Sequence, residues 1–149
     1  MKYILTIFII FFSTSFVNAE DSLISIEKYM KDKGTESLEH NLYALNRCTA
    51  LYMSVSNTMA LYEDEGLKES AKQTYELAEV LFRYSLAPYI DLKKVTQEEA
   101  QNHTKEIVVS LLGLYSNDMN FKLEQNLDPF YGYILTDVDF CNVIVEQIS

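Results

Sequence analysis

Two cysteines are the first candidates for chemistry in this chain, because thiols form disulfides, bind metals and act as nucleophiles. Cys48 lies in "NRCTALYMSV" and Cys141 in "DVDFCNVIVEQ". This separation excludes a C-x-x-C redox site and the C-x-x-C-H signature of c-type haem. Each cysteine falls on the apolar side of a helical pattern, which favours a disulfide between two core-facing thiols. A free buried thiol and an intermolecular bridge are the alternatives.

Two histidines each follow a glutamate by four residues, which places both side chains of a pair on one helix face. The pairs are Glu36 with His40 and Glu99 with His103. If the two helices run parallel in a bundle, these four residues could form a metal site. Di-iron bundles, however, use a Glu-x-x-His spacing that neither pair has. Solvent-facing histidines at two helix starts are the simpler interpretation, and we expect no cofactor and no stoichiometric metal.

Catalytic motifs are missing from the sequence. Ser25 and Lys28 in "SIEK" match the S-x-x-K pattern of serine acyl-enzymes, but the companion S-D-N and K-T-G motifs do not occur. The chain also lacks G-x-G-x-x-G, P-loop, G-x-S-x-G and H-E-x-x-H motifs. We therefore predict that the protein is not an enzyme.

A group of aromatic residues near the C-terminus is a candidate interaction loop. Pro129 and Gly132 break the helical pattern there, and tyrosine is enriched at protein interfaces. The alternative, which is the simpler one, is that this segment folds over the end of the helices. The residues of this candidate loop are Asp128, Pro129, Phe130, Tyr131 and Tyr133.

The elements that would position these residues are helices, because apolar residues recur every three or four positions and glycine and proline are scarce. We expect a short first helix capped by Asp21 or Ser22, and a long helix over about 36–62. A second long helix should run from 67 to near 86, because Pro88 ends or kinks it. A third long helix should start at Thr96, and a last helix should open with a capping box at 136–139. The predicted fold class is all-α: an antiparallel bundle of three long helices plus a C-terminal helix, preceded by a short N-terminal helix and a signal peptide.

The N-terminal segment has the layout of a secretory signal peptide. Lys2 precedes a short apolar run, and "VNA" ends at a small residue, which predicts a signal peptide at 1–19 and one domain at 20–149. A retained membrane anchor is the alternative, although the apolar run is shorter than the roughly 20 residues that span a bilayer. Export to the periplasm or the extracellular space would also provide the oxidising conditions that a disulfide needs.

The acidity of the chain limits its partners. Without Lys2, 11 basic residues stand against 22 acidic ones. Such a protein repels nucleic-acid phosphates and anionic lipid, so we expect no nucleic acid and no stable membrane association after cleavage. We predict a small exported, non-enzymatic protein that binds a partner protein, as inhibitors and immunity proteins do. Its acidity favours a basic exported protein as this partner. The alternative is a bundle that binds a metal or a small ligand, using Glu36, His40, Glu99 and His103 or an apolar cavity between helices.

Overall fold

The computed structural model describes residues 23–148, and these contain five helices and no strand. The all-α prediction is therefore confirmed, with a short first helix, three long packed helices and a C-terminal helix. The predicted signal peptide at 1–19 lies outside the described residues. The helices are α1 (Ile26–Lys33), α2 (Leu38–Met59), α3 (Glu65–Lys93), α4 (Gln97–Glu124) and α5 (Tyr133–Ile148).

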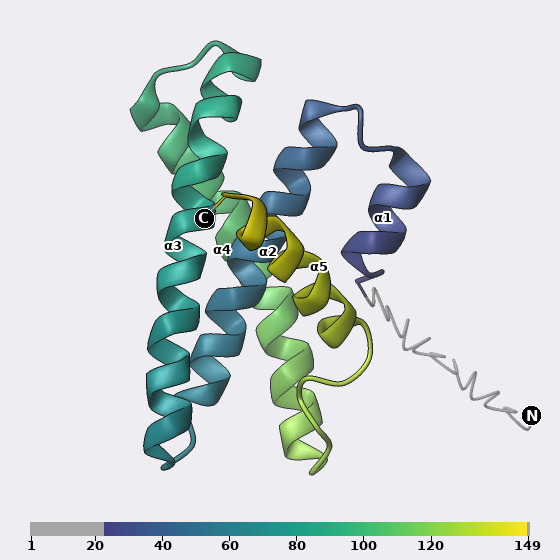
Figure 1. Cartoon of the computed structure of the whole chain (residues 1–149), viewed down its shortest axis with the longest axis vertical. Helices are drawn as coiled ribbons and strands as arrows, with labels where there is room; N and C mark the ends of the chain where they lie inside the picture. The colour runs from purple at the N-terminus through teal and green to yellow at the C-terminus, as the bar shows by residue number, and fades with distance from the viewer. Residues whose placement is uncertain (1–22, 149) are drawn as a thin grey trace, which may run out of the picture.

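Helix α2 is the centre of the structure and packs against all four other helices. Figure 1 shows α2, α3 and α4 running alternately down, up and down, while α1 folds back beside the start of α2. Helix α5 crosses α2 obliquely rather than continuing the up-and-down order (Figure 1). The two short helices thus cover the side of α2 that α3 and α4 leave open.

The sequence of α2 explains its central position, because Arg47 is the one charged residue between Asn41 and Tyr62. A helix without a charged face can be buried on all sides. The predicted apolar stripe is in the core at Leu42, Cys48 and Tyr52, all at most 5% exposed. Residues off that stripe are buried as well, among them Ala44, Asn46, Arg47, Thr49, Ala50, Leu51, Ser54 and Thr58.

Side-chain caps begin three of the helices, α1, α3 and α4. The Thr96 hydroxyl accepts from the Glu99 backbone N–H and the Glu99 carboxylate accepts from the Thr96 N–H, which confirms the capping box that starts α4. Helix α1 begins later than expected, at Ile26, because Ser25 rather than Asp21 or Ser22 caps it. The Ser25 hydroxyl accepts from the Lys28 N–H, so the "SIEK" segment forms a helix start.

Helix α3 differs from the prediction because it continues past Pro88 to Lys93. Proline removes one backbone hydrogen bond and crowds the preceding turn, so local rules favour a break at this position. Tyr89 and Leu92 beyond it pack against the core. Their partial burial offsets the local cost, and the helix extends to the last turn before α4.

The start of α5 is a second difference. Gly132 has φ +80°, which turns the chain into a helix that already begins at Tyr133. Thr136 therefore lies inside the helix, and the predicted capping box at 136–139 is wrong. Asp137, the second residue of that segment, is fully buried and pairs with Arg47 in the core.

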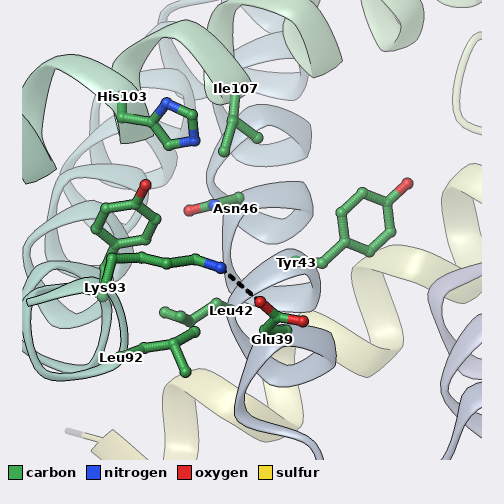
Figure 2. Close-up of a pocket in the computed structure, with 9 residues that line it drawn as sticks. Glu39, Leu42, Tyr43, Asn46, Leu92, Lys93, His103 and Ile107 are labelled. Atoms are coloured by element: carbon green, nitrogen blue, oxygen red, sulfur yellow. Dashed lines mark hydrogen bonds and ion pairs between the residues drawn. The ribbon is translucent and has the colours of Figure 1, made fainter.

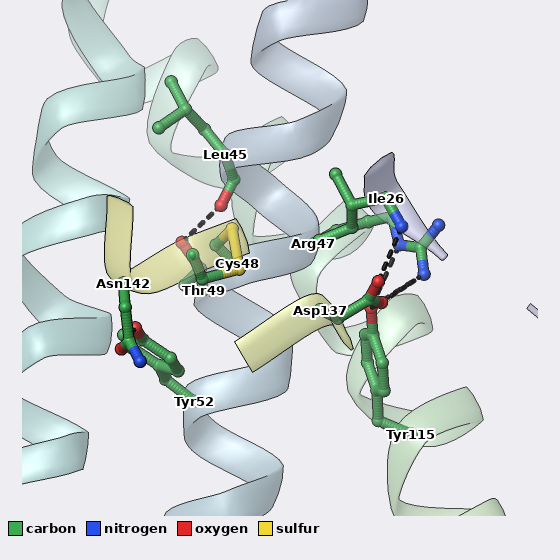
Figure 3. Close-up of a disulfide and its surroundings, with 10 residues drawn as sticks. Ile26, Leu45, Arg47, Cys48, Thr49, Tyr52, Tyr115, Asp137 and Asn142 are labelled. Carbon is green, nitrogen blue, oxygen red and sulfur yellow. Dashed lines mark hydrogen bonds and ion pairs between the residues drawn. A yellow bond between two sulfur atoms is a disulfide. The ribbon is translucent and has the colours of Figure 1, made fainter. Parts of the chain in front are cut away.

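The disulfide between Cys48 and Cys141 is present, as predicted. It joins α2 to α5 with a Cα–Cα distance of 5.5 Å, inside the range that unstrained bridges adopt. Both cysteines are fully buried, and Figure 3 shows the bridge where α5 crosses α2. Within residues 23–148, no helix is long and apolar enough to cross a bilayer.

Candidate functional site

A buried ionic network lies close to the disulfide and joins four helices (Figure 3). The Arg47 Nη2 donates to Asp137 Oδ2 at 2.7 Å, and the Tyr115 hydroxyl donates to the same oxygen at 2.5 Å. The other carboxylate oxygen of Asp137 accepts from the Ile26 backbone N–H at 2.6 Å. Arg47 also donates to the Ile24 carbonyl and, through Nε and Nη2, to the Tyr115 oxygen. The network thus ties α1, α4 and α5 to α2.

The three side chains of this network are at most 1% exposed. Burial raises the pKa of Tyr115, so its hydroxyl keeps its proton and remains a donor to the carboxylate. Burial also raises the pKa of Asp137, while Tyr115, Arg47 and the Ile26 N–H act in the opposite direction by stabilising its charge. Because no substrate can touch groups that are sealed in this way, we assign the network to the architecture and not to catalysis.

The candidate loop at 128–133 divides into buried and exposed parts. Pro129 is buried, Phe130 and Tyr133 are partly buried against the core, and Tyr131 is 72% exposed. The loop backbone is fixed, because the Phe130 N–H donates to Asp128 Oδ1 and the Lys122 ammonium donates to the Tyr131 carbonyl. The Phe130 ring therefore packs against the bundle, as the simpler interpretation predicted. The Tyr131 ring is exposed to solvent on a backbone that hydrogen bonds hold in place.

The two Glu–His pairs have separate surroundings. Helices α2 and α4 run parallel, so their N-terminal ends lie on the same side of the bundle, which is the arrangement that a shared metal site would require (Figure 1). Yet His40 packs edge-on against Tyr29, His103 stacks on Tyr89, and Glu99 is used in the capping box. Among residues 23–148, no three His, Cys, Asp or Glu side chains are grouped to hold a metal ion. The absence of stoichiometric metal stays a prediction for elemental analysis.

A pocket of about 160 Å³ opens between α2, α3 and α4 (Figure 2). Its walls are mainly apolar and aromatic, with Leu42 and Tyr43 from α2, Leu92 from α3 and Ile107 from α4. Its polar lining consists of Asn46, His103 and an ion pair between Lys93 Nζ and Glu39 Oε1 at 2.5 Å. Sequence reasoning raised an apolar cavity between helices only in general terms, because the residues that line it come from three helices whose register no local pattern specifies.

Comparison with known proteins gives no relatives for this chain: no protein-family model, curated protein or solved structure matches it significantly.

Proposed function

We propose that this chain is an exported, non-enzymatic protein that binds a basic partner protein through its 128–133 loop. The observation that carries the proposal is the exposed Tyr131 ring on a loop whose backbone is already held by hydrogen bonds. An aromatic side chain on an ordered loop loses little conformational freedom on binding, so more of its contact energy becomes affinity. Tyrosine is also one of the residues that most often dominate interface energetics.

The surroundings of the loop support the same proposal. Leu127 before it and Leu135 after it are 57% and 52% exposed. Exposed apolar residues near an aromatic anchor supply the water-excluding contacts of an interface. The excess of acidic residues favours a basic partner, whose approach it would accelerate at low salt. A buried disulfide is typical of proteins that work in an oxidising compartment, which supports an exported location.

Affinity capture from the exported fraction of the source cells tests the proposal. The bait is the disulfide-bonded protein, compared with Tyr131→Ser and with Tyr75→Ser, whose ring is 44% exposed on α3. We expect a basic protein that the wild type and Tyr75→Ser retain and that Tyr131→Ser loses, with affinity at least about tenfold weaker in a purified titration. Equal retention by all three baits, or no retention by the wild type, would contradict the proposal.

A further inference from the structure

The pocket between α2, α3 and α4 contains a buried amide that the protein itself does not satisfy. Asn46 is 3% exposed, and its Oδ1 atom has no hydrogen-bond partner. Figure 2 shows the amide end of Asn46 directed toward the side of the pocket where His103 and Lys93 lie. Buried polar atoms are nearly always paired, so this one marks a place where another molecule can supply the missing bond.

The shape and lining of the pocket fit one aromatic ring. Its volume of about 160 Å³ is close to the roughly 150 Å³ of an engineered apolar cavity that takes up benzene. The Tyr89 ring stacks on His103 with a centroid distance of 5.3 Å, and Tyr43 lines the pocket as well. Flat aromatic side chains and aliphatic walls together suit a flat, apolar guest.

The charges at the pocket favour a ligand without net charge. Lys93 and Glu39 neutralise each other across 2.5 Å. Their hydrogen bond lowers the pKa of Glu39 and raises the pKa of Lys93, so both groups stay ionised and paired. An anionic ligand would compete with Glu39 for the lysine, and a cationic ligand would compete with Lys93 for the carboxylate.

We propose that this pocket binds an uncharged single-ring aromatic molecule that carries a carboxamide, with the ring between the apolar walls and the carboxamide paired with Asn46. The asparagine side chain has one carbonyl and one NH₂ group, which rotation about its last torsion interchanges. A carboxamide has the same two groups and forms two reciprocal hydrogen bonds with it. The site is separate from the 128–133 loop and does not depend on the proposed partner protein.

Titration of the disulfide-bonded protein with benzamide, toluene and benzoate, followed by backbone amide NMR, tests this site. We expect saturable shifts at Asn46 on α2 and at Ile107 on α4 with benzamide. Its affinity should exceed that of toluene by at least about fivefold, the size of one net neutral hydrogen bond, and benzoate should bind more weakly than benzamide. In Asn46→Leu, benzamide should fall to the affinity of toluene, because the amide pair is lost.

A pair of tryptophan variants on α4 separates occupation of the pocket from surface binding. Ile107→Trp fills the pocket and should abolish the shifts with all three probes, while Val109→Trp, at a site 55% exposed, should leave them unchanged. Thermal unfolding of each variant establishes that it is folded before titration. The proposal is overturned if benzamide produces no saturable shift at Asn46 and Ile107 in the wild type, if toluene or benzoate binds as tightly as benzamide, or if Ile107→Trp still binds benzamide.

Discussion

The two sides of helix α2 are held by different kinds of interaction. Toward α3 and α4, the contacts come mainly from regularly spaced apolar or small residues, such as Ala78 and Leu81 on α3 and Val108 and Leu111 on α4. Toward α1 and α5, a disulfide and the ion pair between Arg47 and Asp137 are added to the apolar packing. The network around this ion pair also reaches Tyr115 on α4, and the Tyr52 hydroxyl donates to Asn142 Oδ1 on α5.

The lengths of the helices explain this difference. Helices α3 and α4 have 29 and 28 residues, so many weak contacts add up along each of them. Helix α1 has only 8 residues and α5 has 16, and short helices are marginal without strong tertiary support. Specific bonds replace contact area where the area is small. If this comparison is right, single changes on the α1–α5 side should cost more than single changes on the α3–α4 side.

The largest effect should come from breaking the buried ion pair. Arg47→Met leaves the Asp137 carboxylate in the core without its cation, which should lower the free energy of unfolding by about 3–5 kcal/mol. Urea denaturation followed by circular dichroism measures the loss. The double variant Arg47→Met/Asp137→Leu should recover part of it, although the Ile26 N–H then lacks its acceptor. A cost below about 1 kcal/mol for the single variant would show that the network does not hold the α1–α5 side.

Loss of the disulfide should have the next largest effect. The bridge closes a separation of 93 residues, and reduction should cost about 2–4 kcal/mol, less than the chain-entropy maximum. A fall in Tm of about 4–12 °C is expected for a domain of this size. Hydrogen exchange should show α5 losing protection first, because the 128–133 segment is then its only covalent tether. Two free thiols in the unreduced, unfolded protein would refute the bridge.

High pH should weaken the contact between α2 and α5. Burial raises the pKa of Tyr52 to about 12, whereas a tyrosine in the unfolded chain titrates near 10. The folded state therefore holds this proton more strongly than the unfolded state. The contribution of Tyr52 to the free energy of unfolding is complete below about pH 10 and is lost as the pH rises through about 12. The loss amounts to about 2–3 kcal/mol.

Denaturant unfolding between pH 9 and pH 12 checks this prediction with two variants. Tyr52→Phe should lose stability less steeply with pH than the wild type, because the buried titrating group is gone. Tyr131→Phe, which changes a ring 72% exposed, should follow the wild-type profile. Identical slopes for all three proteins would remove Tyr52 from the contacts that specify the α5 position.

The smallest effect should come from the α3–α4 side. Thr96→Ala removes the hydrogen bond that the Thr96 hydroxyl accepts from the Glu99 N–H at the start of α4. The free energy of unfolding should fall by about 1 kcal/mol. Thr96→Ser keeps the hydroxyl and should stay within about 0.5 kcal/mol of the wild type. If Thr96→Ala instead costs as much as Arg47→Met, the two sides of α2 do not differ in the way proposed here.

The parts of the fold that sequence reasoning predicted are those with regular apolar spacing. Leu42, Cys48 and Tyr52 on α2 form a stripe at helical spacing, and Cys141 lies on another, which is why the disulfide could be inferred. Local capping rules also located the start of α4 correctly at Thr96. These features depend on neighbours within one or two helical turns.

The features that were missed depend on partners distant in the chain. Arg47 and Asp137 are residue types that usually lie at the surface, and neither carries a local mark of its partner 90 residues away. One signal was present: Arg47 is the single charged residue in a 22-residue stretch, 41–62, which indicates burial on every side. Pro129 and Gly132 marked the break before α5, although Tyr133 belongs to that helix, and which rings of the candidate loop would pack against the core depended on the position of α5.

The network around Asp137 has a consequence for the order in which the chain can fold. Asp137 accepts from the N–H of Ile26, 111 residues earlier, so the contacts of the first helix are completed only when the last helix is in place. During synthesis from the N-terminus, α2, α3 and α4 can associate while α1 still lacks its acceptor. Contacts that span most of the chain are slow to form, because the entropy of closing a long loop must be lost first. Completion of the native core is therefore a late event that waits for helix α5.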